Sequence, residues 1–199
     1  MSCSLHIEAP VGVDTVLLHT CCAPCSSAIV ECLLGNGITP VIYYCNPNIY
    51  PQSEYLLRKN ECTRFAMSLG LETVDADYDH GKWLSAVRGL EGEPERGLRC
   101  TQCFRYRLLE SARYALANGY KVLATTLASS RWKNLDQINE AGIWAVGTAL
   151  KESGGELVWW GQNWRKGGLQ PRRVEMIREY GFYNQLYCGC EFSMRDANK

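Results

Sequence analysis

The sequence predicts an α/β fold, a Rossmann-like three-layer sandwich in which helices cover both faces of a parallel β-sheet. Three observations support this prediction. Short apolar runs rich in β-branched residues alternate with segments of helical character. The helical segments are long enough to serve as the crossovers that join parallel strands. Glycine and proline separate the elements, as they do at turns.

The first strand is predicted at 13–19, where the run is apolar and starts with β-branched residues. Pro24 then suits the first turn of a helix, because the N–H that proline lacks would have no partner there. This helix continues over 26–34 and ends at Gly35, which begins a Gly-Asn-Gly stop.

The elements that follow keep the same alternation. In order, they are a strand at 40–45, a helix from Pro51 to about Leu69, a strand at 72–76, a helix at 101–118, a strand at 121–126 and a mostly helical stretch at 135–152.

Length and composition indicate one globular domain. The chain has 199 residues, 46% of them hydrophobic, and 21 Lys and Arg balance 21 Asp and Glu. This length suits a single α/β domain over 1–199. Within it we expect 1–12 to be a short N-terminal extension and about 155–199 to close over the site. No apolar run reaches the roughly 18 residues of a membrane span, so we expect no membrane partner.

Eleven cysteines are the unusual feature of the composition, and an odd number cannot pair completely within one chain. The first basic residue is Arg58, so the N-terminus lacks the charged start of a signal peptide. We therefore expect a cytoplasmic protein. In that reducing compartment, clustered cysteines more often bind metal or do redox chemistry than form structural disulfides.

Cysteines and polar residues follow the predicted strands. The segment 20–25, Thr-Cys-Cys-Ala-Pro-Cys, comes after the first strand, and Cys45 and Asn46 end the second. Polar residues at 125–130 end the fourth. Ligands in such sheets bind outside the carboxyl ends of the strands, so the sequence places the site there.

Two cysteine clusters have the spacing of metal ligands. They are Cys21-Cys22 with Cys25, and Cys100 with Cys103. A C-x-x-C at a helix start lets two sulfurs face one metal, and the helix dipole favours thiolates. Adjacent cysteines crowd a single zinc ion and suit two irons of a [4Fe–4S] cluster better. Structural zinc and a thioredoxin-like dithiol at Cys22 and Cys25 remain alternatives.

Cys188-Gly-Cys190 is a third and different cluster. A disulfide across C-x-C closes a small strained ring, and strained disulfides are easily reduced. The pair is therefore interpreted as a reversible redox couple, with extra metal ligands or incidental thiols as alternatives. The remaining cysteines are expected to be bystanders: Cys3, Cys32, Cys45 and Cys62.

Seven motifs in chain order resemble those of the QueH family of epoxyqueuosine reductases, over 13–193. They are His19-Thr20-Cys21-Cys22-Ala23-Pro24-Cys25, Asn46-Pro47-Asn48-Ile49 with Glu54 and Arg58, Asp77-Tyr78-Asp79, Glu93-Pro94-Glu95-Arg96-Gly97, Arg99-Cys100 with Cys103, Thr125-Thr126-Leu127, and Tyr187-Cys188 with Cys190, Phe192 and Ser193. No single motif would be specific, whereas the combination is.

The resemblance implies a cobalamin-independent reductase that removes the epoxide oxygen of epoxyqueuosine in tRNA and yields queuosine, the last step of that modification. It also implies a [4Fe–4S] cluster and one additional iron. By motif, the cluster ligands would be Cys21, Cys22, Cys100 and Cys103. Cys25 is a candidate for the second iron. Cys188 and Cys190 would be the redox-active pair, which an unidentified electron donor would have to regenerate.

The implied fold is similar to that of adenine-nucleotide hydrolase-like and PP-loop proteins. In those proteins a phosphate-binding loop follows the first strand, whereas cysteines occupy that place here, so ATP use is not expected. Three positions depart from the family pattern: Arg131 follows Ser130, Asn163 replaces a common Asp, and Tyr50 replaces a frequent His.

The substrate would be a polyanion, and basic residues gather in one late segment. Arg172 and Arg173 lie there, near Trp159, Trp160 and Trp164, and this combination suits phosphate contact and base stacking. The alternative is a solvated helix face with core tryptophans.

Other candidates are weaker. Arg131, Trp132 and Lys133 form a second RNA-binding candidate, and Asn46 and Asn48 are candidate substrate ligands. The segment 77–79, Asp-Tyr-Asp, would deliver protons, with capping of the next helix or exposure to solvent as the alternatives. Without the resemblance, the alternatives are a zinc-stabilised tRNA- or nucleotide-binding protein and a thiol–disulfide oxidoreductase.

Overall fold

A five-stranded parallel sheet forms the centre of the molecule. The computed structural model describes residues 5–197 of the chain, with side chains to residue 194, so Cys3 lies outside the described residues. The strand order is β3-β2-β1-β4-β5, and every pairing is parallel. The strands are β1 (Thr15–His19), β2 (Thr39–Tyr44), β3 (Thr73–Asp75), β4 (Val122–Thr125) and β5 (Val158–Trp159).

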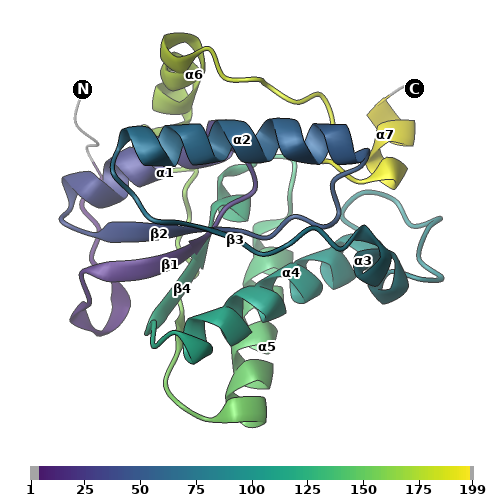
Figure 1. Cartoon of the computed structure of the whole chain (residues 1–199), viewed down its shortest axis with the longest axis horizontal. Coiled ribbons are helices and arrows are strands. Elements are labelled where there is room, and N and C mark those ends of the chain that lie inside the picture. Colours follow the sequence, from purple (N-terminus) through teal and green to yellow (C-terminus); the bar gives the residue numbers. More distant parts are fainter. Residues whose placement is uncertain (1–4, 198–199) are drawn as a thin grey trace.

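Helices cover both faces of this sheet, which confirms the predicted three-layer α/β sandwich. Helices α1, α2 and α6 lie on one face, and α4 and α5 lie on the other with α3 beside them (Figure 1). Their bounds are α1 (Ala23–Gly35), α2 (Gln52–Ser68), α3 (His80–Ala86), α4 (Leu98–Ala117), α5 (Leu135–Ser153), α6 (Leu169–Tyr180) and α7 (Glu191–Ala197), with 3₁₀ turns η1 (Pro10–Gly12) and η2 (Thr126–Ser129).

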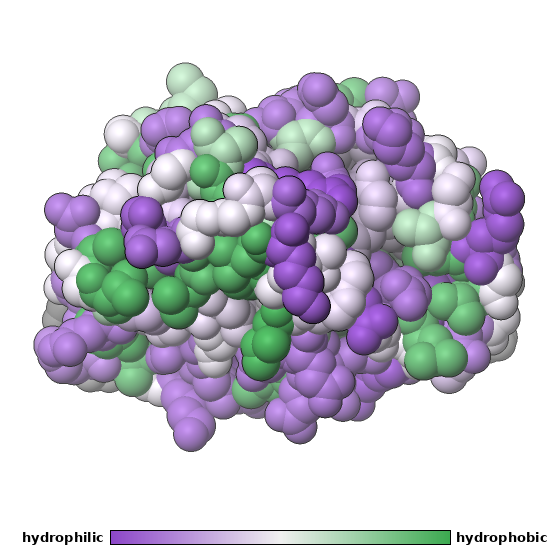
Figure 2. Space-filling model, turned by 90° about the horizontal axis from the view of Figure 1, so that it is seen from below, coloured by the Kyte–Doolittle hydropathy of each residue, from purple (hydrophilic) through white to green (hydrophobic). Residues whose placement is uncertain are grey.

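Alternation along the strands divides the core between the two faces. In β1, Val16 and Leu18 pack with the α1 and α2 side chains, whereas Leu17 packs with the alanines of α4 and α5. Successive side chains of a strand point to opposite faces, so an apolar run buries both of its faces in a three-layer fold. On the α4 and α5 side, exposed hydrophobic side chains form separate patches among hydrophilic ones (Figure 2).

The predicted elements begin and end within three residues of the observed ones, but three α-helices and one strand were missed. They are α3, β5, α6 and α7. Strand β5 has two residues, and α6 buries only Leu169 and Met176, so neither gives a strong periodic signal. Asp79 caps α3 by accepting the N–H of Lys82, which confirms the helix-capping alternative for Asp79.

The chain changes direction across the sheet at β1. After β1 it proceeds to β2 and β3 on one side, and then returns to β4 on the other side. This arrangement opens a crevice between the carboxyl ends of β1 and β4. None of the helices within residues 5–197 combines the length and apolar character needed to cross a membrane.

Candidate metal and redox site

Three cysteines meet at the carboxyl end of β1. Cys21 follows the strand, Cys22 is the N-cap of α1, and Cys25 lies in its first turn. Their sulfur atoms all lie within 4.8 Å of one another, and Sγ of Cys21 is 3.8 Å from Sγ of Cys22. Thr126 fixes Cys21, because its Oγ1 accepts the Cys21 N–H at 3.2 Å and donates to the sulfur at 3.5 Å.

The second cluster lies at the start of α4, where Cys100 is in the first turn and Cys103 in the next. The N–H of Arg96 donates to Sγ of Cys100 at 3.3 Å. Cys103 is buried with Trp83 and Cys190 in a small apolar cluster. The helix N-terminus adds a partial positive charge that favours thiolates at these positions.

The third cluster comes from the segment before α7. The Gly189 carbonyl accepts the N–H of Tyr50 at 2.8 Å, and Arg58 donates to the carbonyl of Cys188 at 3.3 Å. Cys188 and Cys190 are free thiols in this structure. Nε2 of Gln185 also donates to Sγ of Cys22 at 3.3 Å, so the same segment contacts the first cluster.

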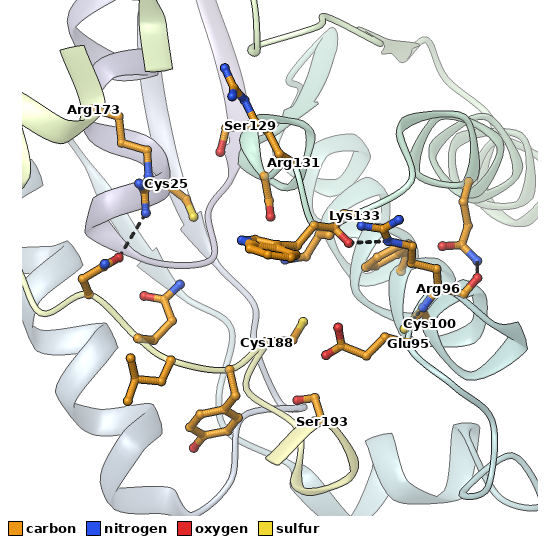
Figure 3. Close-up of a pocket in the computed structure, with 18 of the residues that line it drawn as sticks. Cys25, Glu95, Arg96, Cys100, Ser129, Arg131, Lys133, Arg173, Cys188 and Ser193 are labelled. Carbon is orange, nitrogen blue, oxygen red and sulfur yellow. Dashed lines mark hydrogen bonds between the residues drawn. The ribbon is translucent and has the colours of Figure 1, made fainter. Parts of the chain in front are cut away.

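One cavity of about 450 Å³ connects these clusters, since Cys25, Cys100 and Cys188 all line it. Cys25 and Cys100 lie on opposite sides with Cys188 between them (Figure 3). A smaller cavity beside it is lined by Cys21, Cys188 and Lys133, among others. Thiols from three distant parts of the chain therefore face the crevice at the end of the sheet.

The thiols differ in acidity. Hydrogen bonds from Cys22 and Cys25 hold the pKa of Cys21 well below its ordinary value, although burial acts in the opposite direction. The same coupling raises the pKa of Cys22 well above the ordinary value and that of Cys25 to about 11. Burial raises the pKa of Cys100 to about 12. Without metal, Cys21 is thus the first of these thiols to ionise.

Two cations lie among the thiols. Burial disfavours the charge of Lys133, but attraction by Cys188, Cys21 and Cys25 outweighs burial and raises its pKa. Arg107 is fully buried: Nε donates to the carbonyl of Cys45 at 3.1 Å, and Nη1 lies 4.0 Å from Sγ of Cys103. Both cations therefore balance the negative charge that thiolates bring to the site.

His19, at the end of β1, is fully buried and neutral. Burial first, and Arg107 second, lower its pKa to about 3. Nε2 lies 3.1 Å from the carbonyl of Cys45, which can only accept, so Nε2 carries the proton. Nδ1 then accepts from the hydroxyl of Thr125 at 2.8 Å. His19 thus ties β1 to β4 and to the loop after β2.

The donor set fits a metal cofactor of soft character. Thiolates are the usual ligands of iron–sulfur clusters and also bind zinc, and the neighbouring Lys133 and Arg107 offset the negative charge of the thiolates. Two residues that line the smaller cavity have a buried side-chain oxygen without a hydrogen-bond partner: Oδ1 of Asn48 and Oε1 of Gln185. Within the described part of the chain, no other group of three ligand residues has its donor atoms as close as those of Cys21, Cys22 and Cys25.

The predicted amide ligands have different surroundings. Both polar ends of Asn46 are occupied: Nδ2 donates to the carbonyl of Thr20 at 2.8 Å, and Oδ1 accepts from Arg107. Asn46 therefore holds the loops together, whereas the buried Oδ1 of Asn48 has no hydrogen-bond partner.

The predicted basic and aromatic surface in the late segment is partly wrong. Trp160 and Trp164 are buried in the core, and Trp159 packs over Gly142 of α5, so they form no stacking platform. Arg172 pairs with three carboxylates, those of Glu31, Glu175 and Glu179, at 2.7 to 3.1 Å. Arg173 lines the cavity and donates to Asn184 at 3.2 Å.

The expected bystanders lie in the core, as far as they are described. Cys32 and Cys62 belong to the cluster between α1 and α2, and the side chain of Cys45 faces the opposite one. Asn163, which replaces a common Asp, accepts the N–H of Arg165 at 3.0 Å, and it lines neither cavity.

Sequence reasoning missed the roles of Lys133, Arg107 and Gln185. Arg107 follows Cys103 by four residues on one helix, and this spacing could have revealed it. The sequence predicted Lys133 only as a candidate RNA-binding residue. Its approach to the thiols depends on the loop after β4, and the sequence does not specify that path.

Comparisons with known proteins agree with this geometry. A family model described as Epoxyqueuosine reductase QueH matches residues 16–196. A protein of that name from Histophilus somni is 47% identical over 193 residues, 97% of this chain and 77% of the relative. The Acinetobacter baylyi relative is 44% identical (98% and 87%), and that of Thermotoga maritima is 33% identical (94% and 94%). The chain belongs to the QueH family.

Proposed function

We propose that the protein is an iron–sulfur epoxyqueuosine reductase that converts epoxyqueuosine in tRNA to queuosine, independently of cobalamin. The observation that carries this proposal is the family match over residues 16–196, together with thiols from three chain segments around one cavity. Because tRNA is its substrate, we place the protein in the cytoplasm.

We assign a [4Fe–4S] cluster to Cys21, Cys22, Cys100 and Cys103, and one further iron beside it to Cys25. The thiolates around a four-iron cluster lie farther apart than those around one ion, so the cluster would span the two helix starts. Cys25 supports the second site, because it contacts Cys21 and Cys22 and also lines the larger cavity. When bound, the iron centre would transfer electrons singly and polarise the epoxide oxygen.

The reaction needs two electrons and two protons. The two thiols of Cys188 and Cys190 supply both electrons and both protons and are oxidised to a disulfide, while the epoxide oxygen leaves as water and an alkene forms. An external dithiol or other electron donor then reduces that disulfide. Cys188 lines both cavities, which supports this role.

Lys133 is the second group that we place at the reacting atoms. It lines both cavities, and nearby thiols keep it charged. We assign its ammonium group a hydrogen bond to the departing oxygen, where it would stabilise negative charge as the C–O bond breaks.

The test is anaerobic purification followed by metal, sulfide and turnover assays. The protein should be brown, absorb broadly near ~400 nm and contain about four or more irons with sulfide. It should convert epoxyqueuosine in tRNA. A variant lacking Cys100 and Cys103 should lose cluster and activity, whereas Cys45→Ala, a thiol of the core, should keep both.

A second candidate rests on the three-cysteine group, whose close spacing also suits one zinc ion. Colourless, zinc-loaded protein that binds tRNA without reducing it would replace the reductase by a zinc-stabilised binding protein. Metal-free protein that exchanges disulfides through Cys22 and Cys25 would indicate a thiol–disulfide oxidoreductase.

A further inference from the structure

A large aromatic side chain is exposed at the mouth of the cavity. Trp132, in the loop between η2 and α5, is 79% exposed and lines the larger cavity. Leu186, which is 88% exposed, belongs to the same lining. Large exposed apolar side chains that gather at the mouth of a cavity indicate a surface where a ligand can bind.

Hydrogen bonds to its main-chain carbonyls anchor the loop that carries Trp132. Arg165 donates to the carbonyls of Ser130 and Lys133 at 2.6 and 2.7 Å, and Nε of Arg96 donates to that of Trp132 at 2.7 Å. These bonds fix the main chain and leave the indole exposed. A ligand that covers Trp132 would therefore meet a preorganised surface.

The same rim carries positive charges that have no carboxylate partner. Four cations and one acid line the cavity: Arg96, Arg131, Lys133 and Arg173, against Glu95. Among the side chains that the structure describes, those of residues 5–194, none of the four has a carboxylate oxygen within 4.0 Å, in contrast to Arg172 with its three. Burial, then repulsion by Arg96 and Arg131, lowers the pKa of Arg165.

These features define the chemistry of the partner. An exposed aromatic ring on an anchored loop, beside guanidinium groups without carboxylate partners, suits unpaired bases joined by phosphates, since the ring can stack on a base while the cations contact the backbone. The cations lie around the mouth, with Arg173 on one side, Arg96 on the other and Arg131 between them (Figure 3).

We propose that Trp132 and the surrounding cations, principally Arg131 and Arg173, form the surface that binds the anticodon loop: the indole stacks on an unpaired base next to the reacting nucleotide, and the guanidinium groups contact the flanking phosphates. This inference rests on the proposed function and moves the RNA contact from the basic face around Arg172 to the cavity rim.

The experiment measures binding of a fluorescently labelled anticodon stem-loop RNA, from a tRNA that carries queuosine, at several salt concentrations. Trp132→Ala should weaken binding about 5- to 150-fold, the range that corresponds to loss of one stacked base, and Trp132→Phe should recover most of it. Arg131→Glu should weaken binding and lower the slope of log K against log salt by about 0.7 for each phosphate that the variant no longer neutralises.

Two controls isolate the rim. Lys151→Glu makes the same charge change near the far end of α5, roughly 24 Å along the helix from its start at Leu135. Trp144→Ala removes a tryptophan of α5 that is 39% exposed and lines neither cavity. Both should bind RNA as the wild type does, and melting curves should show that every variant folds.

The outcomes separate this surface from the reductase activity. If the wild type reduces epoxyqueuosine while Arg131→Glu and Trp132→Ala bind RNA normally, the rim is not the RNA-binding surface, but the proposed reductase activity is supported. If both variants bind RNA more weakly but the wild type contains no cluster and reduces nothing, the RNA-binding surface is supported and the proposed reductase activity is wrong. Equal loss in Lys151→Glu would show a net-charge effect and overturn the proposed surface.

Discussion

The guanidinium of Arg58 reaches across 130 positions of sequence and donates a hydrogen bond to the carbonyl of Cys188 at 3.3 Å. Arg58 is 2% exposed, pairs with Glu54 at 2.7 Å and lies over the ring of Tyr187. One side chain of α2 therefore holds the segment that carries two candidate redox thiols.

Replacing Arg58 should release that segment. Arg58→Met keeps most of the buried aliphatic part of the side chain but removes the charge, so Glu54 loses its ion-pair partner. Because one partner of a buried ion pair is removed, the free energy of unfolding should fall by about 3–5 kcal/mol. Alkylation of Cys188 should become faster, as followed by mass spectrometry. Lys59→Met removes the neighbouring exposed pair with Asp75 and should cost less than about 1 kcal/mol. Equal alkylation in all three proteins would contradict the anchoring role.

Gly189 should not accept a side chain. Its φ is +130°, and an added Cβ would lie 3.1 Å from Cγ1 of Ile49 and 3.2 Å from Nη1 of Arg58. Gly189→Ala should destabilise the protein by about 1–3 kcal/mol. Gly147→Ala, inside α5 with open space around it, should instead stabilise by about 0.5–1 kcal/mol. Denaturant unfolding of both variants checks the opposite signs, and a stable Gly189→Ala would refute the close fit.

Acid should weaken the metal-free protein through His19. Its folded pKa of about 3 lies below the ordinary 6.5, so between these values the unfolded chain binds a proton that the folded chain excludes. Stability is therefore full above pH 6.5 and falls as the pH falls. The loss should be about 1.3 kcal/mol between about pH 7 and pH 5.5. His19→Gln should remove this contribution to the dependence of the unfolding free energy on pH. If the variant shows the same pH dependence as the wild type, the buried His19 does not cause it.

Cys188→Ser should abolish turnover that depends on the protein's own dithiol. In an anaerobic single turnover without added reductant, the variant should form little queuosine, because the remaining thiol of Cys190 cannot supply two electrons. Cys45→Ala should react as the wild type does. Unchanged product from Cys188→Ser would exclude the dithiol as the electron source.

Periodicity predicted the sheet well because β1, β2 and β4 are buried on both faces and appear as apolar runs. It missed β5 and α6, which are short or polar and depend on tertiary contacts. The basic and aromatic residues around Arg172 led to the prediction of an RNA-binding surface there. The sequence does not show that two of the tryptophans are buried in the core or that Arg172 pairs with three carboxylates. The cysteine spacing identified the clusters, but not Lys133 between them.

The position of the three thiol clusters along the chain also sets an order of synthesis. Residues 188–190 leave the ribosome after all five strands, so the sheet and the two helix starts that carry Cys22, Cys25 and Cys100 can fold first. Until Gln185 and Cys188 arrive, one wall of the cavity is open. The hydrogen bonds of Arg58 to Cys188 and of Tyr50 to Gly189 then complete this wall.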